Sequence, residues 1–153
     1  MDLTTIGVKV GYAVETTAGT KPAAFTWLKR CKSVGGIDLS IDNIDVTALE
    51  DKIKQYALGL QDTGGNWNLT FGLSDAVVTA LNSMRSAYAT AKADGKATWF
   101  VVWFPDLANS FYVVAEPGNI PMPEAGVGAA AEVNLALTIN EYKGLDTAIE
   151  PTA

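Results

Sequence analysis

The chain has 153 residues, of which 48% are apolar and 18% are charged, and this composition fits one globular domain with a sizeable core. Its net charge of −6 argues against a protein that grips nucleic acid, because neutralising phosphates requires clustered Lys and Arg. The chain has no histidine, so it lacks the usual general base and the commonest metal ligand, and its single cysteine, Cys31, excludes an intrachain disulfide. We therefore expect a protein that is not an enzyme and has no cofactor or metal, with Cys31 as a buried or half-buried small apolar residue.

The first third of the chain predicts two strands. Residues 1–5 lack the basic and apolar stretches of an export signal, so we expect a flexible arm and no signal peptide. No apolar run approaches the roughly 18 residues of a membrane span. Apolar residues alternate through residues 6–14, and a second strand is expected over residues 25–34, after a loop rich in turn residues.

The second of these strands has a basic centre with an aromatic residue, formed by Trp27, Lys29, Arg30 and Lys32. Single-strand nucleic-acid binders mix residues in this way. Because the chain is acidic, we interpret these residues instead as a surface that meets an acidic patch on a neighbouring copy.

Residues 37–47 predict a half-buried strand with an acidic outer face. Ile37, Leu39 and Ile41 alternate with polar residues. Asp38, Ser40, Asp42 and Asp45 follow the spacing that opens a calcium loop, but Asn43 stands where such loops need glycine and Leu49 where they need a bidentate glutamate. We interpret the aspartates as the wet face of a strand and predict no metal site.

Residues 49–62 form a long irregular excursion, of a length that is usually functional or disordered. Besides charged residues it contains several apolar side chains, which a flexible solvent loop would not normally carry. We interpret it as an arm that buries its apolar side against another subunit. The contact candidates are Leu49, Glu50, Asp51, Ile53, Tyr56, Leu58 and Leu60. Glu50 and Asp51 are consecutive, so in an extended chain they point to opposite faces and do not form a catalytic pair.

The middle of the chain predicts a strand followed by a helix. Gly64 and Gly65 turn the chain into a strand over residues 67–73, with alternating apolar residues. Ser74 is a suitable N-cap, and Val77, Leu81, Met84 and Tyr88 form one stripe at the helical period. A helix is therefore expected over residues 75–93, with Gly95 as its stop.

The last third predicts three strands. Residues 98–104 are apolar at both odd and even positions, so other elements should cover both faces of this strand. A hairpin leads to residues 111–115, residues 117–128 are irregular, and residues 130–142 alternate as a long strand. Residues 143–153 are expected to be a flexible polar tail. The fold class is therefore mainly β (α+β), a single domain over residues 1–153, with an antiparallel sandwich or partial barrel and one flanking helix.

The order of elements and the arm resemble the major tail tube proteins of long-tailed bacteriophages. The resemblance covers roughly residues 11–142. It rests on Val46-Thr47-Ala48-Leu49-Glu50-Asp51, then Gln55-Tyr56-Ala57-Leu58-Gly59-Leu60-Gln61-Asp62, then Gly64 and the alternating strand. The resemblance implies a structural virion protein that forms hexameric rings, which stack into a hollow tail tube for DNA ejection into the host.

The family also implies partners and a location. The partners are further copies of the chain and the tail initiator or tip, tape-measure and terminator proteins, while DNA passes without specific binding. Neither a membrane nor a small-molecule substrate is implied. The location is the virion tail, and the host cytoplasm during assembly. We expect Asp38, Asp42 and Asp45 to face the lumen, where negative charge would repel phosphate.

Two other functions fit the same elements. One is a stand-alone β-sandwich module that binds carbohydrate or a cell surface, and such modules usually cluster exposed aromatic residues on one face. The other is the tube of a tailocin-like particle, which the sequence does not separate from a phage tail.

Overall fold

The computed structural model describes residues 2–153. It is mainly antiparallel β with one helix, which confirms the predicted fold class. A seven-stranded sheet has the order β2-β1-β7-β8-β9-β6-β3, and β4 and β5 form a separate two-stranded sheet. The strands are β1 (Lys9–Val14), β2 (Thr26–Leu28), β3 (Cys31–Val34), β4 (Ser40–Asp45), β5 (Tyr56–Asp62), β6 (Asn66–Gly72), β7 (Thr98–Trp103), β8 (Asn109–Pro117) and β9 (Glu132–Thr147).

The seven-stranded sheet curls strongly without closing into a barrel. Its two edge strands, β2 and β3, are joined by only Lys29 and Arg30, so the edges of the sheet approach each other. We predicted one strand over residues 25–34, and this was wrong. Arg30 has a φ of 65°, and this left-handed corner sends the two halves to different partners.

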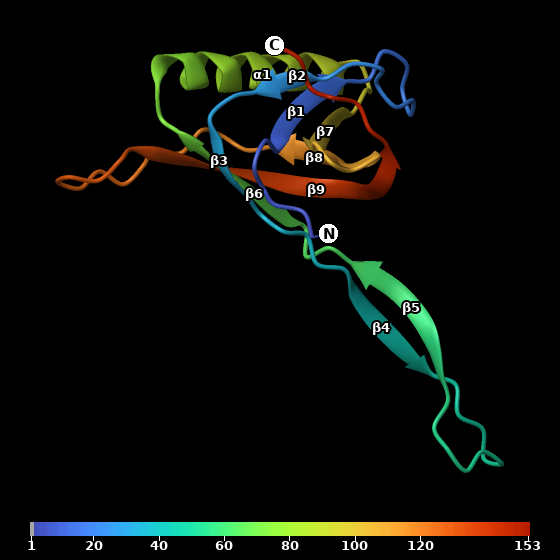
Figure 1. Cartoon of the computed structure of the whole chain (residues 1–153). Helices are drawn as coiled ribbons and strands as arrows, with labels where there is room; N and C mark the ends of the chain where they lie inside the picture. Colours follow the sequence, from blue (N-terminus) through green and yellow to red (C-terminus); the bar gives the residue numbers. More distant parts are fainter. Residues whose placement is uncertain (1) are drawn as a thin grey trace.

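The main core fills the inside of the curl. It takes the alternating residues of β6 and β9 predicted from the sequence, among them Trp67, Leu69, Phe71, Val133, Leu135, Leu137 and Ile139. The single helix, α1 (Asp75–Ala93), adds Val77, Leu81 and Met84 to this core. Figure 1 shows α1 lying along the top of the curled sheet. Its N-cap is Ser74, whose Oγ accepts a hydrogen bond from the backbone N of Val77 at 3.3 Å.

β7 is buried on both faces, as its apolar pattern predicts. Phe100 and Val102 point into the main core, whereas Trp99 and Val101 belong to a second cluster on the outer face. Phe25 and Ile149 cover that cluster, so the loop before β2 and the end of the chain act as a second layer.

The C-terminal residues pack against the sheet, contrary to the expected polar tail. Residues 143–147 continue β9 opposite β8. Beyond them, Thr152 pairs with the outer edge of β2: Trp27 N donates to Thr152 O at 2.8 Å, and Thr152 N donates to Phe25 O at 3.0 Å. At the other end, residues 2–5 belong to no strand, and Met1 lies outside the described residues.

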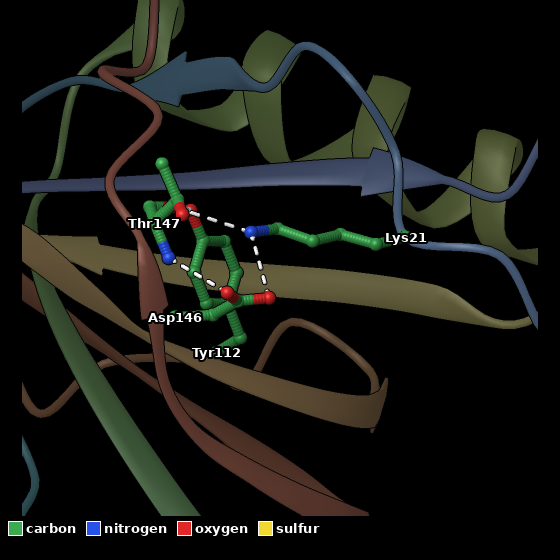
Figure 2. A network of polar contacts seen from close by, with 4 residues as sticks. All are labelled: Lys21, Tyr112, Asp146 and Thr147. Carbon is green, nitrogen blue, oxygen red and sulfur yellow. Dashed lines mark hydrogen bonds and ion pairs between the residues drawn. The ribbon is translucent and has the colours of Figure 1, made fainter.

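A polar network fastens the loop before β2 to the end of β9 (Figure 2). Lys21 Nζ donates to Asp146 Oδ2 at 3.1 Å and to Thr147 O at 3.2 Å, and it lies 4.0 Å from the ring centre of Tyr112. Tyr112 Oη donates to the same Thr147 carbonyl at 2.6 Å. The backbone N–H of Thr147 and Lys21 both bind the Asp146 carboxylate, and these contacts lower the pKa of Asp146. The network therefore ties the end of β9 to the loop before β2.

β4 and β5 form a hairpin that leaves the body of the protein at the side opposite α1 (Figure 1). Two predictions change here. Residues 37–47 do not form a half-buried strand, because no other layer covers β4 and all six of its residues are exposed. Residues 49–62 are not irregular throughout, since Tyr56–Asp62 is β5. Between residues 2 and 153, no helix is both long and apolar enough to span a membrane.

Candidate subunit interfaces

The β4–β5 hairpin, with its tip at residues 46–55, is the most unusual surface of the molecule, and we call it the arm. It carries large apolar side chains that nothing else in the chain covers: Ile41, Ile44, Val46, Leu49, Ile53, Tyr56, Leu58 and Leu60. Leu58 is 68% exposed and Leu60 is 87% exposed. A soluble monomer rarely exposes a contiguous apolar surface of this kind unless the surface binds another molecule.

Strand register places apolar groups on both faces of the arm. Tyr56 pairs with Asp45 and Leu58 pairs with Asn43, so these two apolar side chains share one face, and Ile41, two residues before Asn43, lies on it too. The opposite face carries Ile44, which pairs with Ala57. An arm that is apolar on both faces is suited to lie between two partners.

The arm has a built-in irregularity opposite Asp42. Asn43 pairs with Leu58 and Ile41 pairs with Gln61, so Asp42 alone lies opposite both Gly59 and Leu60, and the extra residue belongs to β5. Gly59 lies against Asp42, and a Cβ on Gly59 would overlap the carbonyl oxygen of Asp42. Glycine at position 59 is therefore required for the two strands to approach each other here.

The tip of the arm is closed by its own polar groups. Thr47 is central: its Oγ1 accepts from Gln55 N at 2.8 Å, and its backbone N donates to Asp45 Oδ1 at 2.9 Å. These contacts with Thr47 lower the pKa of Asp45. Asp51 Oδ2 accepts from Ala48 N at 2.8 Å, and Asp51 N donates to Ala48 O at 3.0 Å. The backbone of the tip is thus organised while Leu49 and Ile53 remain outside it.

The predicted contact residues and the predicted lumen residues fall on the same part of the molecule. Leu49, Glu50, Asp51 and Ile53 lie at the tip, and Tyr56, Leu58 and Leu60 lie on β5. Asp42 and Asp45 lie on β4, and Asp38 lies in the segment leading to it. All of these residues are exposed. Within residues 2–153, no three acidic, cysteine or histidine side chains are grouped as metal ligands would be.

A second candidate surface is the outer face of β6 and β9, which carries no charge along most of its length. We call it the neutral face, and it consists of Asn66, Asn68 and Thr70 of β6 and Asn134, Ala136, Thr138 and Asn140 of β9. Register places these side chains in rows, with Asn66 opposite Thr138 and Thr70 opposite Asn134. Thr70 Oγ1 and Asn134 Oδ1 are hydrogen bonded across the strands.

The two edges of the seven-stranded sheet differ. The outer edge of β2 is partly covered by Thr152, as described above. In the part of the chain that the structure describes, β3 pairs with β6 on one side and has no strand on the other. Such an edge presents free backbone groups to which another chain can add. Cys31, at the start of β3, is half-buried as expected, and burial raises the pKa of its thiol to about 11.

Several important residues were missed at the sequence level. Ile41, Ile44 and Val46 were expected in a half-buried strand, yet they lie exposed on the arm. Glu15 was placed in a loop, but its buried carboxylate accepts hydrogen bonds from Ala97 N at 2.8 Å and Trp99 Nε1 at 3.0 Å. No sequence signal reveals Glu15, because its partners lie more than 80 positions away. The high apolar content of a segment that also holds several aspartates is the signal that could have revealed the arm.

Solved structures with the same fold come from tail assemblies. The chain aligns with the SPP1 tail tube at 13% identity, over 97% of this chain and 81% of that chain, with a TM-score of 0.54. It aligns with a chain from the tail of an empty gene transfer agent (GTA) particle, determined with C6 symmetry, at 15% identity over 92% and 95% of the two chains, with a TM-score of 0.52. A chain from the virion of the native GTA particle gives 14% identity, the same coverage and a TM-score of 0.52. No protein-family model and no curated protein sequence matches the chain.

Proposed function

Because the chain has the fold of tail tube subunits, we propose that it is the major tail tube protein of a long-tailed bacteriophage or a related particle. In this proposal six copies close into a ring, and rings stack into the hollow tube through which DNA passes into the host. The resemblance of residues 46–64 to the family and the fold of the whole chain support the same assignment independently.

The arm is the observation that carries the proposal. It is a hairpin with apolar side chains on both faces, it projects away from the body, and nothing in its own chain covers it. Burying a Leu side chain contributes about 1.5–3 kcal/mol, so a partner on each face would gain several such contributions per subunit. We assign inter-ring and subunit contacts to Leu49, Glu50, Asp51, Ile53, Tyr56, Leu58 and Leu60. A contact that repeats head to tail without closing builds a filament, as a tube requires.

Ring closure would use the open edge of the sheet. Pairing the free edge of β3 with a neighbouring copy would remove an exposed strand edge, which is otherwise an aggregation hazard. The neutral face would then serve as a wet, weakly adhesive wall or as a contact with the next subunit.

The charge of the chain suits passage of DNA. Six copies at −6 give −36 per ring, and the part of this charge that faces the lumen repels phosphate over about 8 Å at physiological salt. We propose Asp38, Asp42 and Asp45 as lumen-facing residues. Changing all three to Asn should slow DNA ejection from assembled particles, and unchanged ejection would contradict this assignment.

The proposed role is structural and not enzymatic. The chain would assemble with itself and with the tail initiator or tip, the tape-measure protein and the terminator, first in the host cytoplasm and finally in the virion tail. The stand-alone binding module gains no support, since Trp99 and Phe100 are buried and form no exposed aromatic face.

Negative-stain electron microscopy of the concentrated protein, with and without tail-tip components, tests the proposal. We expect hollow tubes with a regular axial repeat. A chain that stays monomeric under both conditions, and instead binds a glycan, would replace the tube proposal with the binding module.

A further inference from the structure

An apolar groove opens into the curled sheet beside the root of the arm. Its volume is about 520 Å³, and it is bordered by β3, by residues 35–37 at the arm root and by the adjoining ends of β7 and β8. Val8, Val34, Ile37, Phe104, Phe111 and Tyr142 line it and are only half-buried. α1 adds its apolar face to the same core, whereas nothing in the chain fills this groove.

The chain therefore has both an uncovered apolar projection and an uncovered apolar recess. The projection is the tip of the arm, where Ile53 is 76% exposed and Leu49 is fully exposed. The hairpin leads the tip away from the body, so the tip does not fold back into the groove of its own chain (Figure 1). Two complementary surfaces that cannot meet within one molecule can meet between two copies.

We propose that the tip of the arm of one copy, through Leu49 and Ile53, docks in the groove of a second copy. This inference rests on the proposed tube function and specifies the acceptor of the arm. Because the tip backbone is already organised by Thr47 and Asp51, little conformational entropy is lost on docking.

The Leu49 side of the tip offers a carboxylate to a cationic residue of the groove, whereas Lys52 and Lys54 flank Ile53 on the other side of the tip. Lys32 is the charged residue among the described residues that line the groove. Its ion pair with Glu132, at 3.2 Å, is between exposed side chains and is weak. On the tip, Glu50 follows Leu49 directly, so a docked Leu49 would bring a carboxylate to the cationic border of the groove.

The length of the arm sets the spacing between docked copies. Ile37 lines the groove and Leu49 lies at the tip, and twelve residues of strand at about 3.3 Å each span about 40 Å. If the tip of one copy occupies the groove of the next, equivalent points on successive copies along the arm are at most about 40 Å apart. The axial repeat of the tube is therefore expected not to exceed this value.

Disulfide trapping tests the contact in assembled tubes. Cys31→Ala removes the native thiol, Ser33→Cys places an exposed thiol at the groove, and Ile53→Cys places one at the tip. Since every subunit then carries one thiol of each kind, oxidation of a head-to-tail contact gives a ladder of covalent oligomers. The matched control replaces Ile53→Cys by Val127→Cys, a fully exposed apolar position on the loop between β8 and β9.

The outcomes separate the docking site from the tube function. We expect a ladder with the tip thiol, at a rate at least about tenfold above the Val127→Cys control, because docked thiols share a high effective concentration. Tubes that form normally but give no ladder, or give one equally with Val127→Cys, would overturn the docking site and leave the tube function standing. Failure of the unsubstituted chain to form tubes with its tip components would overturn both.

Discussion

Leu28 and Cys31 are separated by only two residues, yet they belong to opposite edges of the seven-stranded sheet. Leu28 pairs with Val10 of β1, and Cys31 pairs with Phe71 of β6. The corner between them requires Arg30 in the left-handed conformation. This single corner brings the edges of the sheet together and places the free edge of β3 beside the apolar groove.

The corner predicts a residue preference at position 30. The left-handed conformation costs a non-glycine residue about 1–2 kcal/mol, and more for a β-branched one. We expect Arg30→Val to lower the free energy of unfolding by about 1–2 kcal/mol, and Arg30→Gly to leave it unchanged or raise it slightly, as relief of strain offsets the entropy of glycine. Urea denaturation measures both. Lys29→Val is the control. An equal loss of unfolding free energy at both positions would contradict a special requirement of the left-handed corner at position 30.

Glu15 predicts a pH-dependent contribution to stability. Burial by itself raises the pKa of Glu15, but hydrogen bonds from Ala97 N and Trp99 Nε1 outweigh burial and hold the pKa below its ordinary value of 4.5. A lowered pKa means that the folded chain releases this proton more readily than the unfolded chain. The stabilisation is therefore fully present above pH 4.5 and is lost as the pH falls through the lowered folded value.

Two substitutions check this. Glu15→Ala leaves two donors without their acceptor and should cost about 2–4 kcal/mol at pH 7. Glu15→Gln should flatten the loss of stability between pH 5 and pH 3 relative to the unsubstituted chain, as measured by urea midpoints at each pH. Glu124→Ala, at an exposed position, is the control for removing a carboxylate. A Gln variant with the same pH profile as the parent would rule out this role for Glu15.

Gly59 predicts a defect confined to the arm. In Gly59→Ala the new Cβ would meet the Asp42 carbonyl oxygen, so the hairpin must separate locally. Since the arm contributes nothing to either core cluster, the unfolding midpoint of the body should change little. Amide hydrogen exchange should rise along β4 and β5, and tube assembly should be lost. Gly36→Ala, where an added Cβ meets no atom within 4 Å, should behave as the parent does.

Substitutions of Leu58 and Leu60 should impair assembly without changing the stability of the monomer. Leu58→Ser and Leu60→Ser remove exposed side chains, so the unfolding free energy should stay within about 0.5 kcal/mol of the parent value. If the arm is buried in the tube, each change removes about 1.5–3 kcal/mol of burial and should raise the concentration needed for assembly at least about tenfold. Sedimentation of assembled material measures this.

The opposite behaviour is expected in the core. Leu135→Ser, on the buried face of β9, should destabilise the monomer severely and so reduce assembly only through unfolding. Assembly that is unaffected by both arm substitutions would remove Leu58 and Leu60 from the contact.

Elements whose signals are local can be read from the sequence. The helix of residues 75–93 follows from an apolar stripe with an N-cap at Ser74, and β6 and β9 follow from strict alternation. β7 is apolar at both odd and even positions, which predicts that other elements cover both of its faces. This signal is also local, because it is contained in the residues of the strand itself.

Which surfaces remain uncovered depends instead on how the elements pack together. Alternation in residues 37–47 shows which side chains share a face, but not whether another layer lies against that face. Ile41 and Leu135 therefore follow the same pattern, and one projects into solvent while the other is buried. The pairing of Thr152 with β2 and the hydrogen bonds accepted by Glu15 involve partners more than 80 positions away in the sequence. A local hydrophobic pattern contains no information about such contacts.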